Sequence, residues 1–530
     1  MQRYRSVPPK ARFSFVWRIA AAVWLLALSD LLFFGYRGGA VIGAFALAWL
    51  VVLVMSKPAI RRARHARIAI GASAFFALAL IDDPSLLAVL LFLTAIGSAA
   101  LLPGHAFDHA GRWSARLLAL AAKGPFRVVL DLSRTARLPS RGGCTARSIC
   151  LHIALPIGGG GLFLALFANA NPVLGNALSS IRLPDAFTLA LHVILLAVVL
   201  SLVWPSLRPR AIRYAPANAI PRAMRADTPT TAIIVTLAVF NAIFAIENAL
   251  DIAFLWSRAS LPPGVTLADY AHRGAYTLIV TVLMAAAFVL IALRPGSSAA
   301  KNAWVRSLLL VWIAQNILLV ASSVLRLVDY VDAYSLTVLR ICALAWMGLV
   351  AIGLLLVCWR LFAERSAAWL INANTLAAMI VLSLASVVDL GAVSAAWNVR
   401  HTKDPVKLDL CYLQSLGSSS LIPLIRLRDA PVGSAMQDRA VYLSNALYGN
   451  LQTDQAHWQG WTLRGARRLA QADRMLADDP RVAMPAPYGR TCDGAVQSPP
   501  KVYDPPVDPE PQIVPVELPD PKPLTPEQKR

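Results

Sequence analysis

Two carboxylates stand four residues apart inside an apolar segment that is long enough to cross a membrane. Glu247 and Asp251 belong to the segment 230–256, and at about 100° per residue they share one helix face with Asn241 and Asn248. A carboxylate paired with a cation in such a segment acts as a structural clamp. A carboxylate that is desolvated and unpaired can instead bind and release a proton. The residues themselves leave both interpretations open.

Arginines that can pair with these acids occur in the next three apolar segments. Counted along ideal helices at about 1.5 Å per residue, Arg273, Arg326 and Arg340 lie near the same membrane surface as the acids. A charge at the centre of a span costs about 2.5–3.5 kcal/mol, so we expect such groups to face the bundle interior. The predicted polar pocket comprises Asn241, Glu247, Asn248, Asp251, Arg273, Gln315, Asn316, Arg326 and Arg340. Its guanidinium groups would suit a small anionic solute, because they offer a bidentate fork to carboxylate or phosphate.

A helix break is predicted in the segment 148–170. Proline removes a backbone donor, and each glycine disfavours helix by about 1 kcal/mol. The break comprises Pro156, Gly158, Gly159, Gly160 and Gly161. Such breaks line cavities in transporters, but a kink packed against a neighbouring helix through small residues explains the same pattern.

Known catalytic motifs are absent from the sequence. It contains no GxSxG, Walker loop, HExxH or zinc-ligand spacing, so no catalytic residue, cofactor or metal is predicted. One enzyme class can be tested directly against the sequence. Polyprenyl-dependent glycosyltransferases are multi-pass proteins that usually carry acids in the first exterior loop. Here that loop is GYRGG, residues 35–39, and Asp82 and Asp83 come one exterior loop later. An enzyme of this class is therefore the least favoured function.

The elements that must position these residues are transmembrane helices. The 530 residues are 57% hydrophobic and only 15% charged, whereas soluble domains are about 25% charged. A span needs about 17–25 apolar residues. Eleven segments are predicted as spans: 14–34, 39–56, 68–81, 85–102, 148–170, 184–204, 230–256, 274–293, 303–325, 335–362 and 368–393. Segments 68–81 and 85–102 form either a tight hairpin or a re-entrant pair. Asp30 and Asp389 are single acids in predicted spans, with no partner identifiable in the sequence.

The net charge of +21 follows the predicted topology. From Ser394 onward, 16 Lys and Arg face 15 Asp and Glu, so the excess lies in the membrane portion. Loops on the side of the N-terminus hold about 25 basic residues and those on the other side about 5. This bias predicts a cytoplasmic N-terminus and a periplasmic C-terminus in a bacterial inner membrane. It also excludes a nucleic-acid partner, because topology already explains the charge.

Four regions follow from this topology. They are a cytoplasmic N-terminus (1–13), a transmembrane bundle (14–393), a small helical extracytoplasmic domain (394–484) and a disordered proline-rich tail (485–530). The cytoplasmic loop 103–147 contains an amphipathic helix that rests on anionic lipid or docks a cytoplasmic partner. In the exterior region, a helix is predicted at 457–479. Cys411 and Cys492 form one disulfide there or remain two thiols.

Three stretches resemble a known group of proteins. They are ENALDIAFLWSRASLPPGVTLADYAHRGAYTLI, QNILLVASSVLRLVDYVDAYSLTVLRICALAWMGLVAIG and LDLCYLQSLG. Over roughly residues 150–430 the chain is similar to the bacterial multi-pass membrane proteins grouped as domain of unknown function 4173, related to 4153. The resemblance implies an integral membrane protein and carries over no catalytic residue. It adds Tyr270 and Tyr334 to the polar residues of interest.

These observations lead to three hypotheses of function. The leading one is a non-enzymatic inner-membrane protein whose outward-facing pocket binds or transports a small anionic solute. The first alternative is a signalling or assembly component, in which the exterior domain senses a ligand or partner and the basic loops dock a soluble protein or anionic lipid. The second alternative is an enzyme similar to the polyprenyl-dependent glycosyltransferases. The sequence does not specify an oligomeric state.

Overall fold

The chain is all-helical wherever the computed structural model describes it. Regular structure there consists of helices, apart from one isolated bridge between Arg490 and Val496. The predicted all-α fold is therefore confirmed for this part of the chain. Described are residues 9–35, 38–135, 185–209, 229–256, 302–402, 404–477 and 479–499, with scattered positions between 156 and 171.

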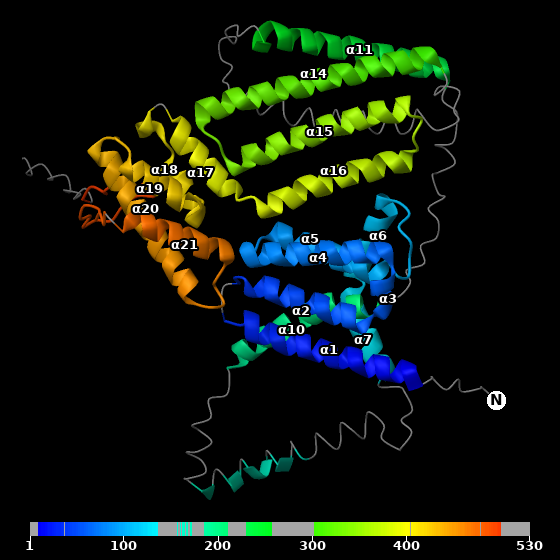
Figure 1. Ribbon diagram of the computed structural model, residues 1–530, viewed down its shortest axis with the longest axis vertical. Helices are drawn as coiled ribbons and strands as arrows, with labels where there is room; N and C mark the ends of the chain where they lie inside the picture. Colours follow the sequence, from blue (N-terminus) through cyan, green and yellow to red (C-terminus); the bar gives the residue numbers. More distant parts are fainter. Residues whose placement is uncertain are drawn as a thin grey trace, which may run out of the picture.

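The first helix bundle is built from the N-terminal half of the chain. Its long helices are α1 (Pro9–Phe33), α2 (Val41–Ser56), α4 (Arg64–Asp82), α5 (Leu86–Leu101) and α10 (Ala186–Leu207). They enclose a core of aliphatic side chains such as Leu25, Leu53 and Leu80, all essentially inaccessible to solvent. Three short helices lie at one end of this bundle, namely α3 (Pro58–Arg62), α6 (Ala110–Ala122) and α7 (Gly124–Thr135) (Figure 1).

The second bundle follows along the chain. It consists of α11 (Thr230–Asp251), which continues as a π-helical turn (Ile252–Trp256), α14 (Ala303–Tyr334), α15 (Val338–Phe362) and α16 (Ala367–Val387). Leu237, Leu309 and Trp312 are in its core. The turn between α14 and α15 places Ser335 at φ +68°, a conformation that non-glycine residues rarely adopt. Only a short turn separates these antiparallel neighbours.

Among the residues that the structure describes, six helices are long and apolar enough to span a membrane: α4, residues Phe187–Leu207 of α10, α11, α14, α15 and α16. Helices α2 and α5 are shorter and apolar. Many apolar side chains on the long helices are exposed, including Ile246, Leu355 and Leu376. A contiguous apolar surface of this kind is rare in soluble monomers, and lipid would cover it. The protein is a multi-pass membrane protein.

The described helices match most of the predicted spans. Nine of the eleven predicted segments overlap described helices, whereas 274–293 and most of 148–170 lie outside the described residues, so the count of eleven stays a prediction. Segments 68–81 and 85–102 correspond to α4 and α5, which pack against each other, and both interpretations of this pair stay predictions. The predicted span 303–325 ends too early. Helix α14 continues to Tyr334, and its 32 residues extend about 48 Å, beyond a hydrocarbon layer of about 30 Å.

The C-terminal domain, residues 390–499, has a core of its own. It comprises α17 (Leu390–His401), α18 (Leu410–Ser415), α19 (Leu421–Asp429), α20 (Ser434–Ala456) and α21 (Leu463–Leu476), with two 3₁₀ turns, Pro405–Lys407 and Gly417–Ser420. Leu413, Leu424 and Leu443 are fully buried in it. The sequence did not predict α20. The predicted helix 457–479 begins later, at Leu463, because Thr462 caps it by accepting a hydrogen bond from the Gly465 amide (3.0 Å).

The folded chain also extends past the predicted boundary at 485. A disulfide joins Cys492 to Cys411, whose Cα atoms are 4.9 Å apart. Arg490 forms an ion pair with Asp438 of α20 at 2.6 Å. These two contacts hold residues 485–499 against α18 and α20, so the part of the predicted tail that is described is folded. Residues 500–530 lie outside the described residues.

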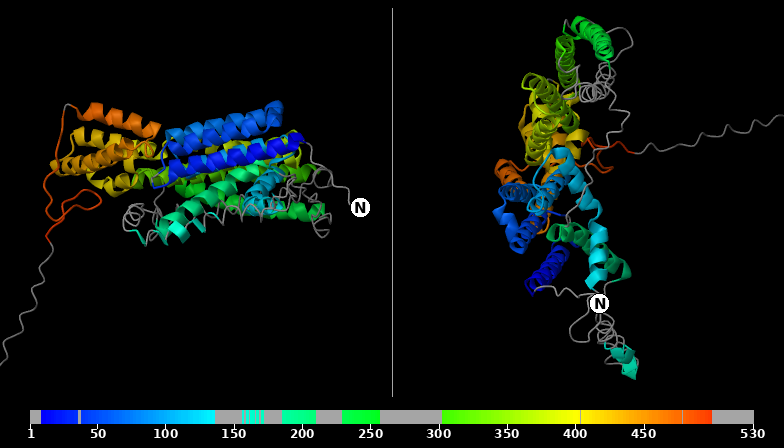
Figure 2. Two further views of the ribbon diagram at one scale, coloured as in Figure 1. Left: turned by 90° about the horizontal axis from the view of Figure 1, so that it is seen from below. Right: turned by 90° about the vertical axis from the view of Figure 1, so that its right-hand side faces the viewer.

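The C-terminal domain lies at one end of both bundles, whereas α3, α6, α7 and the start of α1 lie at the opposite end (Figures 1 and 2). Helix α16 joins the two bundles laterally, since it packs against α4, α5 and α6. One polar contact in this seam is the hydrogen bond from the Ala110 amide to Asn372 Oδ1 (2.8 Å). The molecule therefore has two polar ends separated by apolar helices.

Candidate functional site at the junction of the C-terminal domain and the bundles

The predicted polar face of α11 packs against α14. Asp251 forms an ion pair with Arg326, and the two side chains are only 3% and 10% exposed. Asn241 accepts a hydrogen bond from Gln315 Nε2 (3.2 Å), and Asn248 donates to the Gln315 carbonyl (3.3 Å). Five predicted pocket residues are thus brought together. They form a closed seam of helix–helix contacts, which is the geometry of a clamp.

The other predicted pocket residues lie apart from this seam. Arg340 donates to the carbonyls of Tyr334 (2.6 Å) and Ser335, so it satisfies the C-terminal end of α14, where a cation is favoured by the helix dipole. Asn316 donates to the carbonyl of Trp312 within its own helix (2.7 Å). Glu247 is exposed and has no ion pair with any described residue. Arg273 and Tyr270 lie outside the described residues.

The predicted helix break is described only in part. Pro156, Gly159 and Gly160 are in helical conformation, whereas Gly158 and Gly161 lie outside the described residues. The break stays a prediction.

Tertiary structure supplies partners for the two single acids. Asp30 of α1 lies 2.5 Å from Nδ1 of His192 on α10, and the ring of Phe34 stacks on that histidine at 3.4 Å between centroids. Asp389 lies beyond α16, which ends at Val387, and pairs with Arg468 of α21. The sequence did not identify these partners, because they are 162 and 79 residues away along the chain.

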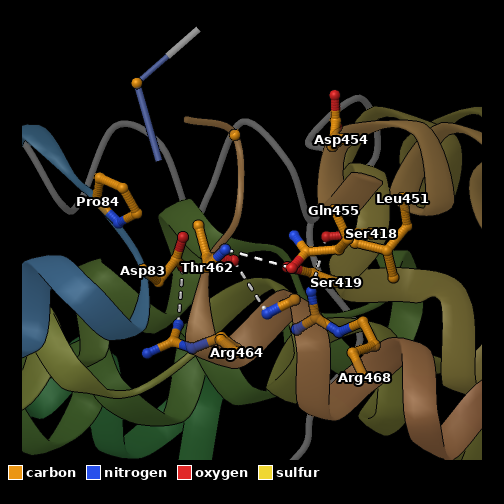
Figure 3. Close-up of a pocket in the computed structure, with 13 residues that line it drawn as sticks. Asp83, Pro84, Ser418, Ser419, Leu451, Asp454, Gln455, Thr462, Arg464 and Arg468 are labelled. Atoms are coloured by element: carbon orange, nitrogen blue, oxygen red, sulfur yellow. Dashed lines mark hydrogen bonds and ion pairs between the residues drawn. The ribbon is translucent and has the colours of Figure 1, made fainter. Parts of the chain in front are cut away.

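Arg464 connects the C-terminal domain to the first bundle. Its guanidinium donates to Asp82 (2.7 and 2.9 Å) and to Asp83 (2.9 Å), the two acids in the turn between α4 and α5. It also donates to the carbonyl of Val387 at the end of α16 (2.6 Å). One side chain of α21 therefore contacts helix ends from both bundles. Figure 3 shows its ion pair with Asp83. Charge-assisted hydrogen bonds of this kind are about twice as strong as neutral ones.

Arg468, one helical turn later, makes a second connection. It pairs with Asp389 and donates to Ser418 Oγ (2.7 Å). Burial alone would raise the pKa of Asp389, but the Ala392 amide, Arg468 and the Ser419 hydroxyl stabilise the carboxylate and lower its pKa. The opposite holds for Asp83, where burial raises the pKa and Arg464 only partly opposes it. Ionisation of Asp389 therefore favours the docked C-terminal domain, whereas ionisation of Asp83 opposes it.

Backbone contacts complete the connection between the first bundle and the domain. The amides of Gly39 and Ala40, in the loop between α1 and α2, donate to the carbonyls of Gln459 (2.8 Å) and Trp461 (2.7 Å). A Cβ atom at Gly39 would lie 2.5 Å from the Gln459 oxygen, so only glycine fits this close approach.

The second bundle is held through the turn between α14 and α15. Asn398 of α17 accepts from the Leu336 amide (2.7 Å) and donates to the Leu336 carbonyl (2.8 Å). The Val338 amide donates to the hydroxyl of Tyr412 on α18 (2.9 Å). The C-terminal domain thus binds turns of both bundles.

A cavity of about 270 Å³ opens within this junction. Asp83 and Pro84 line it from the first bundle, and the C-terminal domain contributes Ser418, Ser419, Arg464 and Arg468 from its inner wall (Figure 3). Asp454 and Gln455 of α20 form another wall. Gln455 accepts a hydrogen bond from the Thr462 amide (3.2 Å), which leaves its Nε2 as a donor. Within the described part of the chain, no group of three His, Cys, Asp or Glu residues could hold a metal ion.

The sequence showed the acids and the arginines of this junction but not that they contact each other. Two acids in a turn between apolar segments, and arginines spaced along one amphipathic helix, were the available signals. Asp82 and Arg464 are 382 residues apart, and no local sequence pattern around either residue predicts that the two will pair. The predicted exterior polar pocket therefore involved other residues than those that line this cavity.

Comparison with known protein families identifies the family of this chain. A family model described as a domain of unknown function (DUF4153) matches residues 66–427, from α4 to α19. This confirms the resemblance inferred from the sequence, with 4153 as the number of the matching family. The matched region contains Asp82, Asp83 and Asp389 but not the arginines of α21. No curated protein and no solved structure matches the chain.

The seam between α11 and α14 yields a first prediction. Asp251→Asn or Arg326→Gln should destabilise the protein by about 3–5 kcal/mol, because each leaves a buried charge without its partner. Thermal unfolding of the detergent-purified protein measures this loss. Glu247→Gln, a matched change four residues from Asp251 on an exposed side chain, should leave the melting temperature unchanged. Equal melting temperatures for Asp251→Asn and Glu247→Gln would show that the pair is not a clamp.

The junction yields a second prediction. Arg464→Gln should accelerate hydrogen exchange of the Gly39 and Ala40 amides, because their hydrogen bonds require the docked domain. Exchange measured by mass spectrometry on the peptide spanning residues 34–45 reports this change. Arg467→Gln is the matched control, since Arg467 is on the same helix, is 72% exposed and only approaches Asp82 at 3.8 Å. Indistinguishable exchange in the two variants would contradict the assigned role of Arg464.

The two acids yield a third prediction. Because the pKa of Asp389 is lowered on folding, its carboxylate stabilises docking above its ordinary pKa of about 3.9, and this contribution is lost as the pH falls through the lower folded value. Asp389→Asn should therefore loosen the junction at pH 7. The pKa of Asp83 is raised, so ionisation of Asp83 opposes docking. Asp83→Asn should therefore leave hydrogen exchange of the Gly39 and Ala40 amides unchanged or make it slower. Faster exchange in Asp83→Asn than in Asp389→Asn would reverse the assignment.

Proposed function

Because the chain belongs to the DUF4153 family, a domain of unknown function, we propose a function from its own geometry. The protein binds a small polar solute in the junction cavity, and binding is coupled to the relative position of its two helix bundles. The observation that carries this proposal is the composition of the cavity wall. Side chains from the first bundle and from α20 and α21 face one space of about 270 Å³.

The chemistry of the wall supports a neutral or zwitterionic solute. Arg464 and Arg468 line the cavity, but their charges are already matched by Asp82, Asp83 and Asp389. Asp454 is at the outer rim of the cavity, is exposed and has no ion pair among the described residues. Its side chain points away from Arg464 and Arg468 (Figure 3). A solute that donates to Asp454 and accepts from Gln455 Nε2 would satisfy both without disrupting the ion pairs. A purely anionic solute, the class expected from the sequence, would have to compete with three carboxylates for the arginines.

Coupling to the membrane helices follows from the contacts around the cavity. A solute that changes the position of α21 also acts on Arg464, which contacts the ends of α4 and α16. The same domain holds the turn after α14 through Asn398. Binding energy can therefore alter the alignment of the bundles, as either transport or transmembrane sensing requires.

We place this cavity on the periplasmic face of a bacterial inner membrane. The charge bias of the loops supports this orientation, since Arg61, Arg62, Arg64 and Arg67 lie at the end opposite to the C-terminal domain. An enzymatic role of the glycosyltransferase type has less support, because Asp82 and Asp83 are already ion-paired with Arg464 rather than free to act as bases.

A signalling or assembly role is the second candidate. The observation that favours it is that one small domain holds both bundles, which would transmit the binding of a partner protein as readily as that of a solute. Deleting the C-terminal domain would then abolish the capture of a specific membrane partner in vivo. Uptake of the solute by proteoliposomes would instead favour transport.

The experiment is a thermal-shift screen of the purified protein against amino acids, sugars, polyols and carboxylates. We expect stabilisation by a neutral or zwitterionic compound, with affinity reduced at least tenfold in Asp454→Asn and in Gln455→Ala. Arg474→Gln, an exposed change on α21 outside the cavity, is the control. A library without any stabilising compound, or a compound whose affinity these two variants leave unchanged, would overturn the proposal. Selective stabilisation by anions would overturn the solute class.

A further inference from the structure

A second cavity, of about 500 Å³, lies at the opposite end of the molecule. It is enclosed by α1, the turn between α2 and α3, the end of α5 and the end of α10. Three cationic side chains line it: Arg18, Lys57 and Arg208. His105 and Ser56 also line it. Residues from four elements thus direct positive charge and hydrogen-bond donors to one space.

The cations in this cavity outnumber their carboxylate partners. Arg208 pairs with Asp131 of α7 at 3.0 Å. Lys57 donates to the Ser206 carbonyl (2.5 Å), and neither it nor Arg18 has an ion pair with a described residue. Like charges that converge without counter-charges cost free energy, and this cost increases with burial.

Two further observations support an anion-binding role for this cavity. Nε of Arg18 and Oγ of Ser56 are buried and make no hydrogen bond within the described part of the chain. Such groups are normally satisfied. Burial, together with the charge of Arg18, lowers the pKa of Lys57 to about 7. An anion in the cavity would accept from the unsatisfied donors and restore the charged state of the lysine.

We propose that this cavity binds a phosphate group. Guanidinium groups offer a planar fork to phosphate oxygens and a lysine adds a point charge, so Arg18, Lys57 and Arg208 form a recognisable phosphate set. This site is separate from the junction cavity and does not depend on the proposed solute.

A lipid headgroup is the source that the surroundings favour. Helices α6 and α7 lie beside the cavity and expose Leu118 (71%), Phe126 (70%) and Leu130 (50%), as amphipathic helices at a membrane surface do. The apolar helices α2 and α5 end at the cavity, so a phosphate bound there is at the depth of lipid headgroups. The cavity is also larger than a phosphate ion, which leaves room for a glycerol moiety.

Native mass spectrometry and thermal unfolding of the full-length protein test this proposal. The probes are phosphatidylglycerol, cardiolipin and a neutral-headgroup glycolipid in detergent, and inorganic phosphate without lipid. We expect the phospholipids to stabilise the protein, with affinity reduced at least tenfold in Arg18→Gln and in Lys57→Gln. Arg61→Gln on α3 is the matched control, because Arg61 is exposed at the same end but does not line the cavity. Ser56→Ala removes a donor without changing charge and provides a milder test if the charge variants fail to fold.

The outcomes separate the sources of the phosphate. Binding of the phospholipids but not of inorganic phosphate, lost in the cavity variants, assigns a lipid headgroup. Saturable binding of inorganic phosphate with the same dependence on the variants assigns a free phosphate ligand. Equal affinity for the neutral glycolipid, or lipid binding that falls as much in Arg61→Gln as in Arg18→Gln, would overturn the site.

Discussion

The alignment of the two helix bundles depends on the ion pairs and hydrogen bonds at one end of their helices. Lipid tails are as apolar as the leucines that face them, so lateral association of transmembrane helices gains little from the hydrophobic effect and derives its specificity from packing and polar contacts. In this protein the polar contacts are concentrated where α4, α14 and α16 end. Arg464 reaches the first and third of these ends, and Asn398 binds the turn after α14. The C-terminal domain therefore links the ends of helices from both bundles, in addition to the lateral packing of α16 against α4, α5 and α6.

Polar groups within the apolar helices have a different role from those at the helix ends. Asp251 and Arg326 satisfy each other between α11 and α14, and Asn241 and Gln315 repeat this pattern deeper in the same seam. These contacts join the two helices directly, which stabilises the helix pair. At the junction, by contrast, the ion pairs surround a cavity, and Asp454 and Gln455 keep unused hydrogen-bonding capacity. Closed polar contacts hold helices together, whereas those that enclose space can bind a solute.

The two cavities differ in charge because they lie at different ends of the protein. Acids of the first bundle neutralise the arginines of α21 at the junction, whereas Asp131 is the one carboxylate paired with the three cations of the opposite cavity among the described residues. This asymmetry follows the distribution of basic residues along the chain. The proposed solute cavity, with balanced charge, and the proposed phosphate site, with excess positive charge, therefore lie at opposite ends of the apolar helices.

Local patterns in the sequence determined the membrane class, the all-helical fold, most helix positions and the family. These properties depend on apolar runs, period and nearby caps, which act over a few turns of chain. The sequence also located the polar face of α11 and the acids at residues 82 and 83. It could not show that Asp251 would pair with Arg326 rather than Arg340, or that Asp82, Asp389 and Arg464 would meet in one junction. Residues 75 to 382 positions apart pair only after helices have packed, and apolar periodicity is the same whichever neighbour a helix has. Tertiary structure therefore decided which charges are neutralised and where space remains beside them.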